Sequence, residues 1–134
     1  MNNLIYNEFL KSEDTLRVYA DDLLLFSSRK ERLIPLLEYI DRFAVDNLGV
    51  TILDKIMGNA AALLSIKAGC QEVGSPLGSQ IAIGTLERYG IKYRLNKIIP
   101  YIEQPDSADM CPMEKLSIDK DPEEFYAIMK TTMI

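Results

Sequence analysis

Apolar and polar residues follow two rhythms along this chain, and together they predict an alternation of strands and helices. Short runs of aliphatic, β-branched and aromatic residues bounded by turn formers are typical of strands. Apolar residues at every third or fourth position are typical of helices. The expected strands cover 15–19, 23–27, 50–53, 71–73 and 92–99. The expected helices cover 4–10, 31–43 with a start near 32, 55–68, 80–89, 110–116 and 121–130.

Residues with special backbone roles set the ends of these elements. Asp21 and Asp22 provide the turn of a hairpin between the first two strands. Asp54 and Ser79 are the expected N-caps of the helices that follow them, because their side-chain oxygens can accept from the free amides of a first turn. The segment 74–78, Gly-Ser-Pro-Leu-Gly, is expected to be a loop.

The order of the elements indicates the fold class. A hairpin is followed by three strands that alternate with helices, and such crossovers join parallel strands and place helices over the faces of a sheet. The sequence therefore predicts an α/β fold, a three-layer α/β/α sandwich around a mixed sheet. A chain of 134 residues fits a single domain over 1–134, and it shows neither an internal repeat nor a dividing linker.

The net charge and the sequence pattern argue against two classes of partner, nucleic acids and membranes. The formal net charge of −5 argues against a sequence-independent grip on nucleic acid, which needs clustered Lys and Arg. The start of the chain lacks the basic region and apolar run of a signal peptide, and no stretch is long enough to span a bilayer. We therefore expect a cytoplasmic protein with neither a nucleic-acid nor a membrane partner.

Histidine is absent, and this is the most restrictive fact of the composition. Its absence removes His-dependent catalytic pairs and His-ligated metal sites. The two cysteines, Cys70 and Cys111, are too few for a structural zinc site or a disulfide scaffold. We expect two free thiols, with Cys70 structural, and neither a metal nor a cofactor.

Three segments carry a resemblance over nearly the whole chain, from about Thr15 to Lys130. They are 54–62 (DKIMGNAAA), 75–77 (SPL) and 110–115 (MCPMEK). These segments resemble an uncharacterised family known as domain of unknown function eighteen-ninety-three, which is similar in fold to cytidine deaminases. The resemblance implies a cytidine-deaminase-like three-layer sandwich, and it brings no established reaction.

The chain departs from true zinc deaminases at the residues that their chemistry needs. Those enzymes hold zinc with a His or Cys at one helix start and two Cys at the next, and they use a Glu as general acid and base. In this chain, 54–56 (Asp-Lys-Ile) stands where His-x-Glu would lie, and 76–80 (PLGSQ) stands where Pro-Cys-x-x-Cys would lie. Zinc would lack most of its ligands, so the architecture is expected without that reaction.

A ligand site is expected at the carboxyl ends of the parallel strands. Ligands of layered α/β proteins bind there, because helix N-termini offer free amides and partial positive charge. We predict a pocket for a small anionic or nucleotide-like ligand. The residues expected to line it are Lys55, Gly58, Ser75, Pro76 and Ser79, with Asp54 as a candidate catalytic group. The alternative is that Asp54 and Ser79 merely cap helices and that Lys55 is solvated.

Cys111 is the candidate nucleophile. A thiol at a helix start can have a lowered pKa, and Pro112 suits the first position of a helix. Glu114 stands where a capping-box carboxylate reaches back to the chain, and without histidine an activating base would be Asp109, Glu114, Lys55 or water. The alternative is a small half-buried thiol beside an ordinary capped turn.

Three functions stay open from the sequence. The first is a catalytically divergent deaminase-like domain that binds a small metabolite where the helices start. The second is a cysteine-dependent enzyme or redox sensor that uses Cys111. The third is a non-catalytic interaction domain that self-associates into a homo-oligomer. Fold-level likeness does not choose among them.

Overall fold

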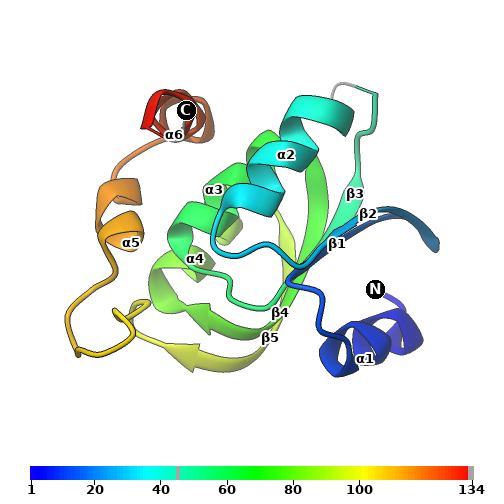
Figure 1. The fold of residues 1–134 in the computed structure, drawn as a ribbon, viewed down its shortest axis with the longest axis horizontal. Coiled ribbons are helices and arrows are strands. Elements are labelled where there is room, and N and C mark those ends of the chain that lie inside the picture. Colours follow the sequence, from blue (N-terminus) through cyan, green and yellow to red (C-terminus); the bar gives the residue numbers. More distant parts are fainter. Residues whose placement is uncertain (45, 133–134) are drawn as a thin grey trace.

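The computed structural model describes residues 1–44 and 46–132, which form an α/β fold around one mixed sheet of five strands in the order β2-β1-β3-β4-β5 (Figure 1). The strands are β1 (Leu16–Ala20), β2 (Leu23–Ser28), β3 (Val50–Asp54), β4 (Cys70–Ser79) and β5 (Lys92–Ile99). The helices are α1 (Asn3–Lys11), α2 (Ile34–Phe43), α3 (Asn59–Lys67), α4 (Gln80–Arg88), α5 (Pro112–Ser117) and α6 (Pro122–Thr132).

The sheet has an antiparallel half and a parallel half. β1 pairs antiparallel with both β2 and β3, and Asp21 adopts the left-handed φ of 52° in the tight turn between β1 and β2. β3, β4 and β5 pair parallel and are joined through α3 and α4. Because right-handed crossovers that advance in one direction lie on the same side of a sheet, α3 and α4 share one face.

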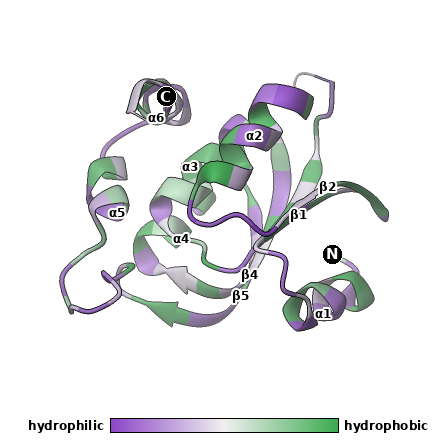
Figure 2. Cartoon of the chain, in the orientation of Figure 1, coloured by the Kyte–Doolittle hydropathy of each residue, from purple (hydrophilic) through white to green (hydrophobic). Residues whose placement is uncertain are grey.

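Helices cover both faces of the sheet, as predicted, but unevenly. The larger core lies between the sheet and α2, α3 and α4, and Figure 2 shows apolar stretches on the strands and on these helices. Among the residues that the structure describes, α1 alone covers the other face, where Tyr6 and Phe9 pack with Tyr19 and Leu53. The mixed sheet and α/β class are confirmed, whereas likeness to cytidine deaminases and the single domain over 1–134 stay predictions.

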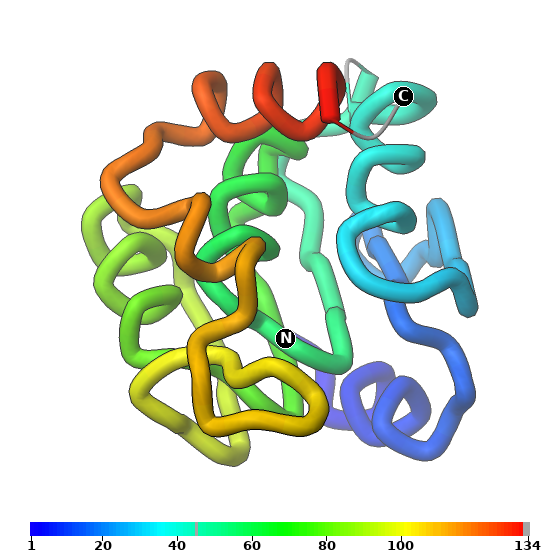
Figure 3. Tube along the Cα trace, turned by 60° about the vertical axis from the view of Figure 1, so that its left-hand side comes forward, coloured from blue at the N-terminus to red at the C-terminus, as the bar shows by residue number. Residues whose placement is uncertain are grey.

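α3 is enclosed on all sides. Every residue from Asn59 to Ser65 is buried, because the sheet lies under this helix and α6 packs over it through Phe125 and Met129 (Figure 3). Its alanines permit this close approach. None of the helices in residues 1–44 and 46–132 combines the length and the apolar character needed to cross a membrane.

The loop predicted for 74–78 is wrong, because β4 continues through it to Ser79. The last pair between β3 and β4 is Leu53–Gly74, so no strand pairs with Pro76 on that side. The missing amide proton of Pro76 therefore costs no hydrogen bond there. On its other side β4 keeps pairing with β5 as far as Ser79–Ile99. Pairing with β5 therefore overrides the local turn signals.

Two helix starts also differ from the prediction. The third helix begins at Asn59 and not near Lys55, because residues 55–58 first run beside the end of β4. The second helix begins at Ile34, since Arg32 has a left-handed φ of 59° that helical geometry excludes.

Candidate functional site

The segment that follows β3 lies beside the end of β4. The Met57 amide donates to the Leu77 carbonyl (2.8 Å), and the Ser79 amide donates to the Met57 carbonyl (3.1 Å). Met57 also forms an isolated parallel bridge with Gly78. The carboxyl ends of the two strands therefore meet in one place.

A third segment from much later in the chain reaches the same place. A Cβ added to Gly58 would lie 2.7 Å from Ile102 Cγ1 and 3.0 Å from Glu114 Oε1. The Cys111 amide donates to the Ile102 carbonyl (2.7 Å), so the start of α5 is held there too. We call the surface formed by residues 54–59, 77–79, 102 and 111–114 the carboxyl rim. Figure 3 shows the segment between β5 and α6 passing beside α3.

Glu114 ties the carboxyl rim together. Its side chain is 2% exposed, and its two oxygens accept from the Asn59 amide (2.5 Å) and the Ile102 amide (2.8 Å). The capping box predicted for Glu114 within its own helix is wrong, because the carboxylate crosses to α3. Gly58, the N-cap of α3, has no side-chain oxygen, so Glu114 supplies the acceptor and the negative charge at that helix start.

Asn59 is a residue of the carboxyl rim to which the sequence assigned no role. Its side chain is 3% exposed, and its Nδ2 donates to the Ser117 Oγ (2.9 Å) and the Ser117 carbonyl (3.2 Å). Its Oδ1 accepts from the Thr85 hydroxyl. These bonds join α3, α4 and α5. The sequence did contain a signal for this role. Asn59 is a polar amide at the start of an otherwise apolar helix, and a buried amide needs hydrogen-bond partners.

Asp54 is the last residue of β3 and not a helix cap, which corrects the prediction. Its Oδ1 accepts from the Ile56 amide (3.2 Å) in the turn before α3. Burial raises the pKa of Asp54 to about 7, and the hydrogen bonds from the Ile56 and Lys55 amides, which lower it, compensate only in part. The carboxyl group thus changes protonation near neutral pH, and its protonated form can donate a hydrogen bond.

The Lys55 ammonium extends toward α1 and the segment that follows it. Its Nζ donates to the carbonyls of Ser12 (2.7 Å) and Asp14 (2.9 Å) and lies 4.5 Å from the centroid of the Phe9 ring. Burial lowers the pKa of Lys55, and the nearby charge of Asp14 opposes that shift. To bind an anion at the carboxyl rim, Lys55 would have to break both hydrogen bonds.

The two serines predicted near the ligand have partners inside the protein. The Ser75 hydroxyl donates to the Leu77 carbonyl (2.8 Å), and the Ser79 hydroxyl accepts from the Ala82 amide (3.0 Å). The second contact confirms Ser79 as the N-cap of α4. Pro76 is half-buried between them. A direct ligand contact of these three residues stays a prediction.

The two thiols have different surroundings. Cys111 is half-buried and directly precedes Pro112, the first residue of α5, as predicted. Both oxygens of Glu114 accept from backbone amides, which fits a structural role better than that of a base toward Cys111. Cys70 opens β4, and burial raises its pKa to about 12, which fits an inert thiol.

A cavity of about 290 Å³ lies away from the carboxyl rim. Its walls include Asp21, Asp22, Thr51 and Glu72, which belong to the β1–β2 turn and to the amino ends of β3 and β4. Its carboxylates suit the predicted anion poorly, and that of Glu72 already pairs with the Met1 ammonium (3.0 Å). Residues 1–44 and 46–132 contain no group of three or more acidic or thiol side chains placed to hold a metal ion.

The fold and the carboxyl rim together define an α/β protein with a mixed sheet. In this protein the start of α3 is capped by Glu114, a carboxylate from a distant part of the chain. The family model described as a domain of unknown function (DUF1893) matches residues 5–133, so the chain belongs to the DUF1893 family. A crystal structure of a DUF1893 family protein from Thermotoga maritima, at 2.70 Å resolution, is similar, with a TM-score of 0.86 and 30% sequence identity. The similarity covers 97% of this chain and 88% of that chain. A search of curated proteins gave no match.

Proposed function

We propose that this protein is a deaminase-like binding domain that holds a small nucleoside-like or nucleotide-like ligand at the carboxyl rim, without zinc chemistry. The observation that supports it most is the meeting of three chain-distant segments around Gly58, with the buried carboxyl group of Asp54 at the end of β3. In open α/β sheets ligands bind beyond the carboxyl ends of the strands, and a buried carboxyl group with a raised pKa is frequent at such sites.

The charges of the carboxyl rim favour a nucleoside over a phosphate group. Glu114 already caps α3 with negative charge, Ser79 caps α4, and the Lys55 ammonium is held by two carbonyls near α1. A phosphate would therefore have to displace a buried carboxylate. The anionic ligand expected from the sequence thus becomes the less favoured form of the proposal.

Asp54 suits the polar edge of a nucleobase in either protonation state. When protonated it can donate to a ring nitrogen or a carbonyl oxygen, and when ionised it can accept from an exocyclic amine. Ile56, in the same turn, is 49% exposed and supplies apolar surface beside it. Neither contact requires a metal. Use of Cys111 as a nucleophile stays a prediction, because no base contacts its thiol among the interactions described above.

A thermal-shift comparison tests this proposal. Cytidine and adenosine, their 5′-monophosphates, ribose 5-phosphate and inorganic phosphate are each added at millimolar concentration to the protein. A ligand that binds only the folded state raises the free energy of unfolding, by about 2.7 kcal/mol at a concentration one hundred times Kd. The melting temperature rises as a result. We expect at least one nucleoside to raise the melting temperature more than inorganic phosphate does.

Two variants locate the response. Asp54→Asn removes the titrating group and keeps the acceptor for the Ile56 amide, so we expect it to weaken the nucleoside response. Glu123→Gln changes an exposed carboxylate that pairs with Lys67, and we expect it to keep the response. A flat response to every compound, or equal responses in both variants, would contradict the proposal.

A further inference from the structure

β2 is an edge strand that lacks charged and proline residues, and a bulge at Leu25 is the one protective device within it. It covers Leu23–Ser28 and carries no charged side chain, and within residues 1–44 and 46–132 its one pairing partner is β1. Leu23 is 66% exposed and Leu24 is 45% exposed, and Figure 2 draws this end of the strand as strongly apolar. An exposed apolar edge of this kind is a template for another strand.

The opposite edge of the sheet is built differently. β5 carries three cationic residues, Lys92, Arg94 and Lys97, and two of them are exposed. Charged side chains on an edge strand are a common device that prevents edge-to-edge association. The contrast marks β2, and not β5, as the edge open to a partner.

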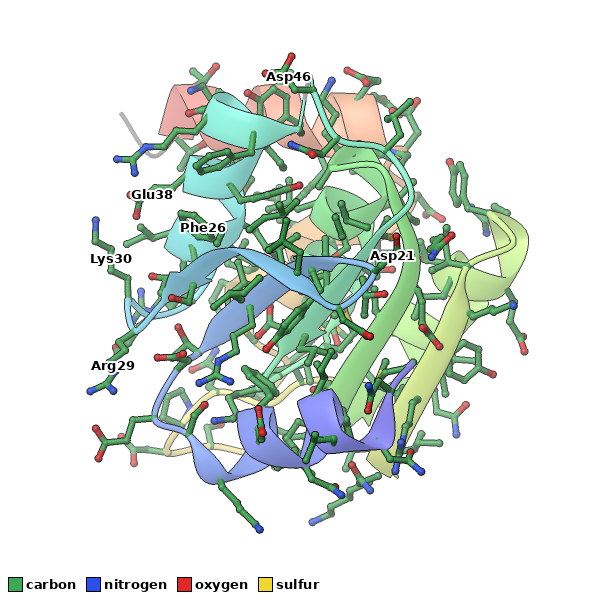
Figure 4. The ribbon with its side chains drawn as sticks, turned by 90° about the vertical axis from the view of Figure 1, so that its right-hand side faces the viewer. Asp21, Phe26, Arg29, Lys30, Glu38 and Asp46 are labelled. Atoms are coloured by element: carbon green, nitrogen blue, oxygen red, sulfur yellow. The ribbon has the colours of Figure 1, made fainter. Side chains whose placement is uncertain are left out.

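Charges of opposite sign flank β2 on its two sides. Asp21 and Asp22 are exposed immediately before it, and Arg29 and Lys30 are exposed immediately after it. Figure 4 shows Asp21 at one end of the strand and Arg29 and Lys30 at the other. An antiparallel partner with the same sequence would therefore place acidic residues opposite basic ones at both ends.

The register shift in β2 makes this self-pairing consistent with the faces of the sheet. The β1–β2 register skips Leu25, so Leu23 and Ser28 pair with Ala20 and Leu16. Those two β1 residues share one face, because they are an even number of positions apart. Leu24 and Ser27 likewise share the other face through their β1 partners. If Leu23 of one copy lies opposite Ser28 of another, and Leu24 opposite Ser27, each pair therefore has both side chains on the same face of the sheet.

We propose that β2 pairs antiparallel with β2 of a second copy of this chain about a two-fold axis near Phe26. In this arrangement Asp22 lies opposite Arg29 of the other copy, and Asp21 lies opposite Lys30. Isologous interfaces of this kind require a self-complementary surface, which the order acidic, apolar, basic provides. The two sheets of five strands then form one continuous sheet of ten.

Existing contacts of the basic residues do not prevent this pairing. Arg29 contacts Glu13 and Asp14, and Lys30 contacts Glu38, but the Arg29 and Lys30 side chains are 68% and 62% exposed. Ion pairs at such exposure are weak and exchange partners easily. The bulge at Leu25 bends the strand beside the two-fold axis, so the intermolecular hydrogen bonds form on the two flanking halves of β2.

Sedimentation equilibrium over a range of protein concentrations tests this interface by charge reversal. Asp22→Arg alone and Arg29→Asp alone each place like charges opposite one another at two symmetric positions. We expect each to weaken the dimer roughly tenfold or more. The double variant Asp22→Arg/Arg29→Asp restores opposite charges and should recover most of the wild-type association. Lys97→Glu, an exposed reversal on β5, should leave the association unchanged.

The outcomes separate this interface from others. Circular dichroism and the melting temperature check that each variant is folded. A wild-type protein that stays monomeric at every concentration would overturn the proposal. A dimer that the two single reversals leave intact, or that the double variant fails to restore, would show that another surface associates.

Discussion

Two buried carboxyl groups at the carboxyl rim differ in how the fold compensates their charge. Glu114 accepts one backbone amide with each oxygen and lies at the positive end of α3. Asp54 accepts from the Ile56 amide in the turn that follows β3, and burial raises its pKa to about 7. The first group is therefore compensated by hydrogen bonds and by the helix start, whereas burial favours the second as the neutral acid.

Replacing Glu114 with Gln tests the remote cap. The amide group can accept with only one of its two ends, so either the Asn59 or the Ile102 amide loses its acceptor in a buried place. We expect the free energy of unfolding to fall by about 1–3 kcal/mol in urea titrations. The matched control is Glu123→Gln, whose carboxylate is 73% exposed and bonds to Lys67, and it should change stability by less than about 1 kcal/mol. Equal losses in both variants would contradict a special role for Glu114.

Asp54 predicts a dependence of stability on pH. Its pKa is about 7 in the folded protein and 3.8 for the unperturbed group, so between these values the folded state holds a proton that the unfolded chain has released. The free energy of unfolding therefore falls as pH rises through this interval, by up to roughly 4 kcal/mol from this group.

Urea unfolding of the wild type and Asp54→Asn at about pH 4 and about pH 8 isolates that contribution. The variant has no titrating group, so its stability relative to the wild type should increase from the lower to the higher pH. A difference between the two proteins that stays constant across this range would show that the carboxyl group of Asp54 is not buried as described.

At the scale of elements, local pattern located the hairpin, both crossovers and the limits of β5, but it failed where distant segments decide. The Gly-Ser-Pro-Leu-Gly segment has the composition of a loop, yet Ser75 and Leu77 pair with Leu95 and Lys97 of β5. The start of α3 depends on Glu114, whose position in the sequence gives no sign of this contact. Neither long-range pairing can be read from a window of neighbouring residues.

Gly58→Ala tests how tightly α5 is held against the start of α3. The added Cβ would lie 2.7 Å from Ile102 Cγ1 and 3.0 Å from Glu114 Oε1, so these side chains must move. We expect a loss of about 1–3 kcal/mol and faster proteolysis within residues 100–111.

Gly84→Ala is the matched control for that substitution. Gly84 lies inside α4 with no atom within 4 Å of an added Cβ, so alanine should stabilise by about 0.5–1 kcal/mol through helix propensity. Similar stability in the two variants would argue against close packing at Gly58.

For the whole molecule, composition and element order were sufficient for the fold class, and the resemblance to DUF1893 is confirmed by the family match. The candidate site was predictable only in part. The sequence placed Asp54 and Gly58 near one rim, but it expected the Lys55 ammonium there, gave Glu114 a capping role within its own helix, and assigned no role to Asn59. Side-chain direction separates these cases, because Lys55 extends to the α1 side while Asn59 faces α4 and α5.

The proposed ligand binds at the carboxyl rim and not in the cavity at the other end of the strands. The most direct measurement is a titration of isotope-labelled protein with cytidine or adenosine, followed by amide chemical shifts. Binding at the carboxyl rim predicts that the largest changes cluster at residues 54–59, 77–79, 102 and 111. Changes centred on Asp21, Thr51 and Glu72 instead, or no changes at saturating nucleoside, would contradict it.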